Sequence, residues 1–121
     1  MKTHQDMRAP RHISIWLGSM TDEDQLDAYL SETFAEDFGF EIYEPDGPEA
    51  TAQSETSVRE LLTGFSAWRY FVDAAVAAAS AAGIDKASSA IVFYNFIYDP
   101  ALIKNSKAPY VYIGAIPYAI P

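Results

Sequence analysis

The segment HISIWLG (residues 12–18) has the residue pattern of a β-strand. Its aliphatic residues at positions 13, 15 and 17 share one face, Trp16 lies on the opposite face, and Gly18 ends the strand. A second segment, from Ala90 to Tyr98, is apolar on both faces apart from Asn95, which is typical of a central strand covered by helix on at least one side. The two segments predict a sheet with helices packed on it.

The sequence after the first strand predicts a broken helix. Thr21 is placed to cap it, and the acidic residues that follow are stabilised by free backbone amides and the helix dipole. One straight helix would turn an acidic residue onto the apolar stripe, so we expect a break near Ser31, a second short turn and a stop at Gly39. Residues 40–43 then predict a short strand, and Pro45–Ser57, which lacks periodicity, predicts a long mobile loop.

The second half of the chain predicts one more helix and one more strand. Ser66 is placed to cap a helix over residues 67–82, and Gly83 follows as its stop. Pro109–Ala115 predicts a strand within hairpin reach of the central one. We therefore expect an α+β fold, a mainly antiparallel sheet with two or three packed helices, in a single domain over residues 12–121 that follows a flexible N-terminal arm, residues 1–11.

Composition narrows the classes of function. The formal net charge of the 121 residues is −9, which opposes direct binding to nucleic acid or to an anionic membrane. Cysteine is absent, no stretch is long and apolar enough for a membrane span, and residues 1–11 lack the apolar core of a signal peptide. A cytoplasmic protein that binds a basic partner is the expectation.

The acidic residues are concentrated in one third of the chain. Residues 21–58 hold twelve Asp and Glu and no Lys or Arg, whereas all eight basic residues and only five acids lie outside. Such a region costs self-repulsion, but its field speeds encounter with a basic partner; the alternative is a surface that only keeps the protein soluble. The predicted partner contacts are Asp22, Glu23, Asp24, Asp27, Glu36, Asp37, Glu44 and Asp46, with Tyr43 as an aromatic anchor.

No motif favours catalysis, a metal site or a cofactor. The two histidines, His4 and His12, are not placed as a metal-binding pair, and the acids at positions 22, 24 and 27 lack the glycine turn and distal glutamate of a calcium loop. There is no G-x-S-x-G elbow and no glycine-rich phosphate loop. A small carboxylate-dependent enzyme remains an alternative, which a substrate-sized pocket enclosing two acids would favour.

Several separated segments agree, in order, with one known family. They are HISIWLG followed by the acidic helix and FAEDFG (34–39), then LLTGF (61–65), the strand 91–99 ending in Tyr-Asp, and YIGAIPY (112–118). Over about residues 12–118 the chain thereby resembles the immunity protein 22 family of bacterial polymorphic toxin systems. It departs from the family pattern mainly in residues 45–57 and in the alanine-rich helix, which makes both candidates for toxin specificity.

The resemblance implies a non-enzymatic protein that binds and neutralises a cognate toxin, with no catalytic residue carried over. Toxins that attack nucleic acids usually present a basic cleft, so the acidity favours an inhibitor of a nuclease or a nucleic-acid deaminase. An acidic DNA-mimic regulator of a basic host protein is the alternative, and a toxin gene directly upstream would distinguish the two. Toxin identity and oligomeric state are left open.

Overall fold

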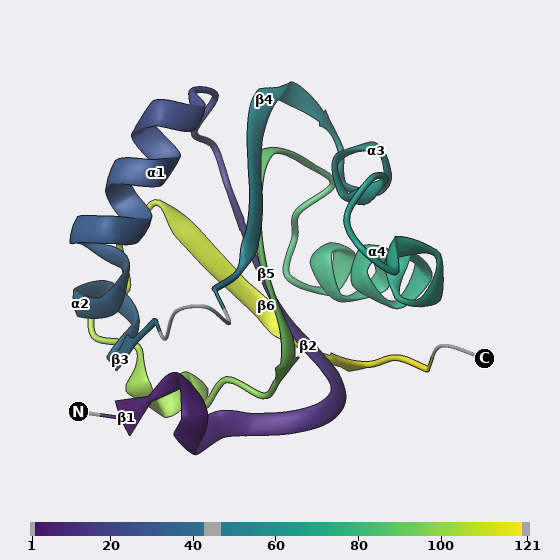
Figure 1. Cartoon of the computed structure of the whole chain (residues 1–121). Helices are drawn as coiled ribbons and strands as arrows, with labels where there is room; N and C mark the ends of the chain where they lie inside the picture. The colour runs from purple at the N-terminus through teal and green to yellow at the C-terminus, as the bar shows by residue number, and fades with distance from the viewer. Residues whose placement is uncertain (1, 43–46, 120–121) are drawn as a thin grey trace.

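The computed structural model of the chain describes residues 2–42 and 47–119, arranged as in Figure 1. The strands are Lys2–Thr3 (β1), Arg8–Gly18 (β2), Phe40–Glu41 (β3), Glu49–Ser57 (β4), Lys86–Phe96 (β5) and Tyr110–Pro117 (β6). The α-helices are Glu23–Glu32 (α1), Phe34–Phe38 (α2), Val58–Leu62 (α3) and Val72–Ala81 (α4), and single 3₁₀ turns are His4–Met7 (η1), Trp68–Tyr70 (η2) and Pro100–Leu102 (η3). No helix among these residues is long and apolar enough to cross a membrane.

Four strands form an antiparallel sheet in the order β4-β5-β2-β6, which confirms the α+β class and both strands predicted first. β1 and β3 form a separate parallel pair. The predicted hairpin between β5 and β6 is wrong, because β2 lies between them: Ile15 is paired with Val92 on one side and Gly114 on the other. β5 and β6 are both antiparallel to β2 and therefore parallel to each other, so the connection over residues 97–109 returns along the sheet. It runs from the start of β2, where the Ile97 amide donates to the Met7 carbonyl oxygen, to the end of β2, where Tyr110 is paired with Gly18.

Helices cover both faces of the sheet, with α1 and α2 on one side and α3 and α4 on the other (Figure 1). The alternation in β2 decides which side chain goes where, since neighbouring residues of a strand point to opposite faces. Ile13, Ile15 and Leu17 pack under α3 and α4, whereas Trp16 packs under α1 and α2. The protein thus has two apolar cores that share one sheet.

Aromatic rings fill the core beneath α1 and α2. Trp16 is completely buried, and its ring lies 4.9–6.3 Å from six others, which we call the aromatic cluster: Phe34, Phe38, Phe40, Phe93, Tyr98 and Tyr112. Its indole N–H has no hydrogen-bond partner in the described part of the chain, so ring packing alone holds the side chain. Three of these rings come from residues 34–40, and they therefore tie α2 and β3 to the sheet.

The helix break is confirmed, two residues after the predicted position. α1 ends at Glu32, Thr33 separates it from α2, and Gly39 ends α2 in the left-handed conformation (φ 76°). A Cβ at Gly39 would collide with the Leu102 carbonyl oxygen, so glycine is required there. The helix cap is Asp22, and not Thr21 as predicted: the Asp22 carboxylate accepts from the Asp24 amide at 2.8 Å.

Part of the predicted loop is a strand. Residues 49–57 form β4 at the edge of the sheet, paired with β5, and the short β3 was predicted at its observed start, Phe40. β4 has little apolar alternation because only Ala52 is buried, which is why its sequence looked like a loop. The predicted loop residues 45 and 46 lie outside the described residues.

The predicted helix 67–82 begins later than expected. α4 starts at Val72, after η2, and Ser66 does not cap a helix. Its amide donates to a Glu49 carboxylate oxygen at 3.1 Å, and its carbonyl oxygen accepts from the Tyr94 hydroxyl at 2.7 Å. These long-range bonds hold Ser66 outside any helix, an effect that local sequence does not reveal.

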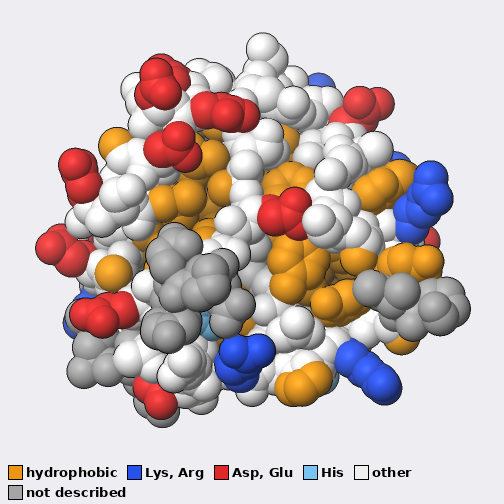
Figure 2. Space-filling model, viewed as in Figure 1, with side chains coloured by type: hydrophobic (Ala, Val, Ile, Leu, Met, Phe, Trp, Pro, Cys, Tyr) orange, Lys and Arg blue, Asp and Glu red, His pale blue; other side chains and the backbone are white. Residues whose placement is uncertain are grey.

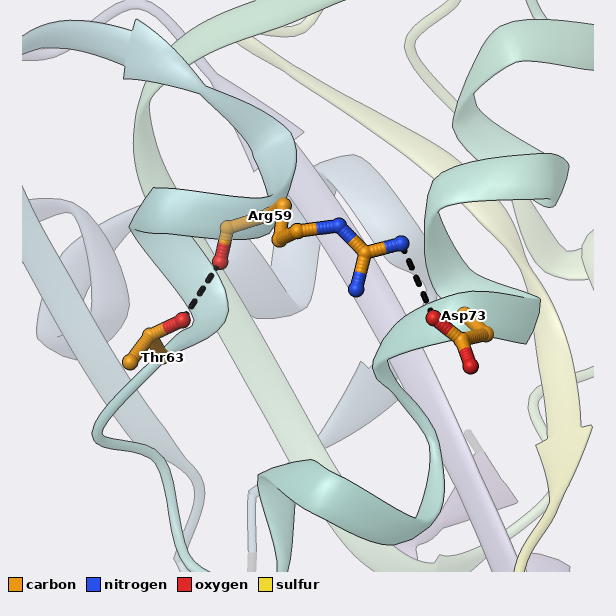
Figure 3. Close-up of polar contacts among 3 residues, drawn as sticks. All are labelled: Arg59, Thr63 and Asp73. Carbon is orange, nitrogen blue, oxygen red and sulfur yellow. Dashed lines mark hydrogen bonds and ion pairs between the residues drawn. The ribbon is translucent and has the colours of Figure 1, made fainter.

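Sequence reasoning also missed α3, whose cap is Ser57. The Arg59 guanidinium on α3 lies 2.8 Å from the Asp73 carboxylate on α4, and the Thr63 hydroxyl donates to the Arg59 carbonyl oxygen (Figure 3). Because the two charged side chains are 53% and 87% exposed, this ion pair orients α3 and α4 but adds little stability.

Residues 2–11 belong to the segment that we expected to be a flexible arm, and in the structure they contact the rest of the domain. His4 and Met7 are buried, and the His4 ring packs edge-on against Phe93 and Phe96 at 5.3 and 4.8 Å. β1 adds a parallel pairing with β3. Two buried residues in a short polar segment give no periodicity, so the sequence pattern could not show this packing.

Asp37 is the one predicted contact residue that the structure places in the interior, with 6% of its surface exposed. Its carboxylate accepts from the Tyr29 hydroxyl at 2.7 Å and from the Asn105 side-chain amide at 3.0 Å. Burial raises the pKa of Tyr29, and the bond to Asp37 raises it further, so the hydroxyl remains a donor. Asp37 joins α1, α2 and the loop after η3, and it is not available to a partner.

Replacing the central ring tests the aromatic cluster. We expect Trp16→Ala, and equally Phe38→Ala, to lower the free energy of unfolding by about 3–5 kcal/mol, because each leaves a large cavity in a closed core. Denaturant unfolding measures the loss. The control Val111→Ala removes a side chain that is 48% exposed and should cost less than about 0.5 kcal/mol. Equal losses in the three variants would show that the cluster does not hold the fold.

Neighbouring carboxylates on α2 provide a matched test of the Asp37 bonds. Asp37→Asn should cost about 1.5–3 kcal/mol, because the new amide turns a donor toward Tyr29 or Asn105. Glu36→Gln removes the same charge from an exposed position and should change stability by less than about 0.5 kcal/mol. Unfolding curves in which the two variants coincide would contradict a structural role for Asp37.

Candidate functional site

The predicted contact acids that the structure describes come from one helical layer. Five of them are exposed on α1, its cap and α2: Asp22, Glu23, Asp24, Asp27 and Glu36. Glu32 on α1 and Glu41 on β3 are exposed beside them, although neither was predicted as a contact. We call these seven residues the acidic surface. Tyr43, Glu44 and Asp46 lie outside the described residues, and Asp37 is buried.

Local structure explains why α1 tolerates so many acids at its start. The Asp22 carboxylate bonds a free backbone amide, and Glu23 and Asp24 lie in the first turn, where the helix dipole favours negative charge. Beyond the first turn, α1 stabilises acidic side chains less. Asp27 follows Glu23 by four residues, so the two like charges share one side at a cost of about 0.2–0.5 kcal/mol.

Basic side chains of the described residues form no ion pairs with the acidic surface. Within residues 2–42 and 47–119, none of its seven carboxylates forms an ion pair, in contrast to Asp73 on the other helical layer. Figure 2 shows red side chains gathered on the α1 and α2 side, and most blue side chains at the opposite and lower margins. Basic residues approach this surface at two borders. The Lys104 amide donates to the Asp37 carbonyl oxygen and brings the loop of Lys104 and Lys107 beside α2, and Lys2 on β1 is paired with Phe40, next to Glu41.

A hollow of about 680 Å³ opens within this surface, between α1 and the residues before β4. We call it the α1–β4 hollow, and its described lining is Asp27, Leu30, Ser31, Ala35, Glu41, Ile42, Gly47 and Pro48. Asp27 and Glu41 are therefore brought together from different elements, with apolar side chains between and below them. Figure 2 shows apolar side chains between α1 and β4, with acidic side chains around them.

Sequence reasoning could not find the second carboxylate of this hollow. Glu41 is placed there by β3, which pairs with β1 through Thr3, and a two-residue parallel pair leaves no pattern in the sequence. Leu30 and Ile42 are half-buried and pack against the core beneath α1 and α2. They consequently form the inner wall of the hollow and part of the core at once.

Two carboxylates in a hollow of this size also meet the geometric condition set for a carboxylate-dependent enzyme. However, both Asp27 and Glu41 are exposed, whereas an acid-base pair needs burial or a close neighbour to keep one carboxyl protonated at neutral pH. No group of three or more His, Asp or Glu among the described residues is placed to hold a metal ion. The arrangement is suited to binding positive charge.

Comparison with known proteins assigns the chain to a family. The sequence matches the immunity protein 22 family over residues 13–119, which is most of the chain and includes both helical layers. No curated protein and no solved structure matches it. Immunity proteins neutralise a cognate toxin and are typically inhibitors without enzymatic activity. The chain therefore belongs to the immunity protein 22 family.

Proposed function

We propose that this protein neutralises a toxin that acts on nucleic acid, a nuclease or a nucleic-acid deaminase, by covering its basic active-site cleft with the acidic surface. Family membership supports a cognate toxin as the partner. The chemistry of that toxin is inferred from the charge it must complement, since a cleft that holds a phosphate backbone is lined by Lys and Arg. The inhibitor occupies the cleft in place of the substrate.

The observation that carries this proposal is the set of exposed carboxylates on α1 and α2 that form no ion pair with any other residue described by the structure. An ordinary surface interleaves both signs, because a field of one sign costs stability. Here the self-repulsion is retained on a helix pair that is fixed to the core through Tyr29 and Phe34. A rigid acidic layer binds a basic cleft with little loss of conformational freedom.

Electrostatics then acts at two stages of binding. At long range the field of the acidic surface raises the association rate from about 10⁶ toward 10⁸–10⁹ M⁻¹s⁻¹ at low salt. At contact, close ion pairs slow dissociation. Both stages favour rapid and lasting capture of a toxin inside the cell that makes it.

Co-expression with the toxin gene beside this protein's gene tests the proposed function. Cells should survive toxin expression only when this protein is present, and the purified toxin domain should be basic and bind it directly. If cells die with or without the protein, the immunity role is wrong. If it protects against a toxin with an acidic cleft, or instead binds a basic host DNA-binding protein, the nucleic-acid toxin proposal is wrong and the DNA-mimic alternative gains support in the second case.

Charge reversal on α1 tests the surface itself. Asp24→Lys with Asp27→Lys should slow association with the toxin domain by about tenfold or more at low salt and flatten its salt dependence. The fold should be retained because both side chains are exposed and neither makes a side-chain hydrogen bond among the described residues. Stopped-flow kinetics at several salt concentrations gives both quantities.

A matched control makes the same change of net charge elsewhere. Glu60→Lys with Asp85→Lys reverses two exposed acids, at α3 and just before β5. We expect this pair to slow association much less than the α1 pair. Equal effects would mean that only net charge matters, and the acidic surface would no longer be the candidate interface.

A further inference from the structure

We infer that the α1–β4 hollow is a specific binding site for an arginine side chain of the toxin. This inference rests on the proposed function and extends it. The acidic surface as a whole attracts positive charge without selecting a particular residue. The hollow adds shape: it is a concave site of about 680 Å³, within the range of about 300–1,000 Å³ typical of binding pockets. It is therefore the place where the surface can select one group of the partner.

The lining of the hollow matches the two parts of an arginine side chain. Leu30, Ile42 and Pro48 supply apolar contacts for the aliphatic stem, and Asp27 and Glu41 supply carboxylates for the charged end. Long basic side chains are amphipathic in the same way. Arginine fits better than lysine, because a guanidinium is less strongly hydrated than an ammonium and lies flat against apolar groups.

Two walls of the hollow, formed by α1 and β3, are held by the core before any partner binds. On one wall α1 is tied to the core by Leu26 and Tyr29, which are 2% and 6% exposed. On the other wall Glu41 is part of β3, and Phe40 beside it is completely buried in the aromatic cluster. Walls that are already held in place reduce the entropic cost of ordering side chains on binding, so contacts made to them contribute more to affinity.

This inference separates two roles among the acids. Carboxylates on the outer side of α1, such as Asp24 and Glu32, do not line the hollow and should act mainly through the association rate. Asp27 and Glu41 should act mainly through the dissociation rate, because an arginine seated between them is partly removed from water.

A small probe tests the hollow without the toxin. In an NMR titration of the ¹⁵N-labelled protein, N-acetyl-arginine methylamide should shift amide signals around Asp27, Ser31 and Glu41 with millimolar affinity. The citrulline analogue, a neutral isostere, should give at least about tenfold weaker shifts at the same amides. Equal shifts from both probes, or shifts spread over all acidic residues, would overturn the inference.

Matched variants identify the residues responsible. Asp27→Asn with Glu41→Gln should abolish the localised shifts, whereas Asp24→Asn with Glu32→Gln, which removes the same charge, should preserve them. Ser31→Phe keeps every charge and fills the hollow, so it should also abolish binding of the probe. If the filled variant or the first pair still binds as the unsubstituted protein does, the hollow is not the site.

The same variants test whether Asp27 and Glu41 bind an arginine side chain in the toxin complex. The Asp27 and Glu41 pair should raise the dissociation rate at least about tenfold, and the Asp24 and Glu32 pair less than about threefold. Equal increases in the dissociation rate would contradict an arginine-binding site in the hollow. They would leave the proposed function intact, because protection in co-expression does not depend on where arginine binds. Loss of protection by the unsubstituted protein would instead disprove the proposed function, whatever the probe shows.

Discussion

Trp16 of β2 packs against aromatic rings from both halves of the chain, and this contact fixes the side of the sheet on which the acids lie. The rings of Phe34, Phe38 and Phe40 surround it, so the chain from α2 to β3 has only one way to cover that face. α1 precedes this segment and is held through Tyr29, whose hydroxyl meets Asp37. Apolar packing of aromatic rings thereby positions a set of charges that would otherwise repel one another.

The two helical layers differ in how many exposed acidic residues they carry without an ion pair among the described residues. On α4 the exposed Asp73 is paired with Arg59 of α3, whereas Glu60 on α3 is exposed and forms no ion pair among the described residues. On α1 and α2 the exposed acids have no such partner among the described residues. The sheet separates the layers, so the seven acids of the acidic surface all lie on the side of α1 and α2. The geometry supports an inhibitor whose binding face is rigid, acidic and hollowed at one place.

The sequence was most informative where structure follows from local pattern. The alternation in residues 12–18 predicted β2 and the face of Trp16, and Gly39 marked the end of α2. Features set by distant contacts were not predictable. Asp37 has the same charge as its neighbour Glu36 in the sequence. In the structure it is buried and accepts hydrogen bonds from Tyr29 and Asn105.

The same difference between local pattern and distant contacts applies to β4 and to the candidate site. β4 owes its existence to pairing with β5, and not to its own polar sequence. Of the candidate site, the acids of α1 were predictable from composition and helix capping, because local structure exposes them. The α1–β4 hollow was not, since Asp27 and Glu41 meet only through the packing of two elements on the sheet.

Carboxyl footprinting of the complex with the cognate toxin domain tests the central claim most directly. A carbodiimide reagent labels accessible Asp and Glu, and mass spectrometry compares the free and bound protein residue by residue. The account predicts that labelling falls at Asp24, Asp27 and Glu36 while exposed acids of the other layer, Glu60 and Asp85, are labelled as before. Protection of Glu60 and Asp85 with unchanged labelling on α1 and α2 would contradict it.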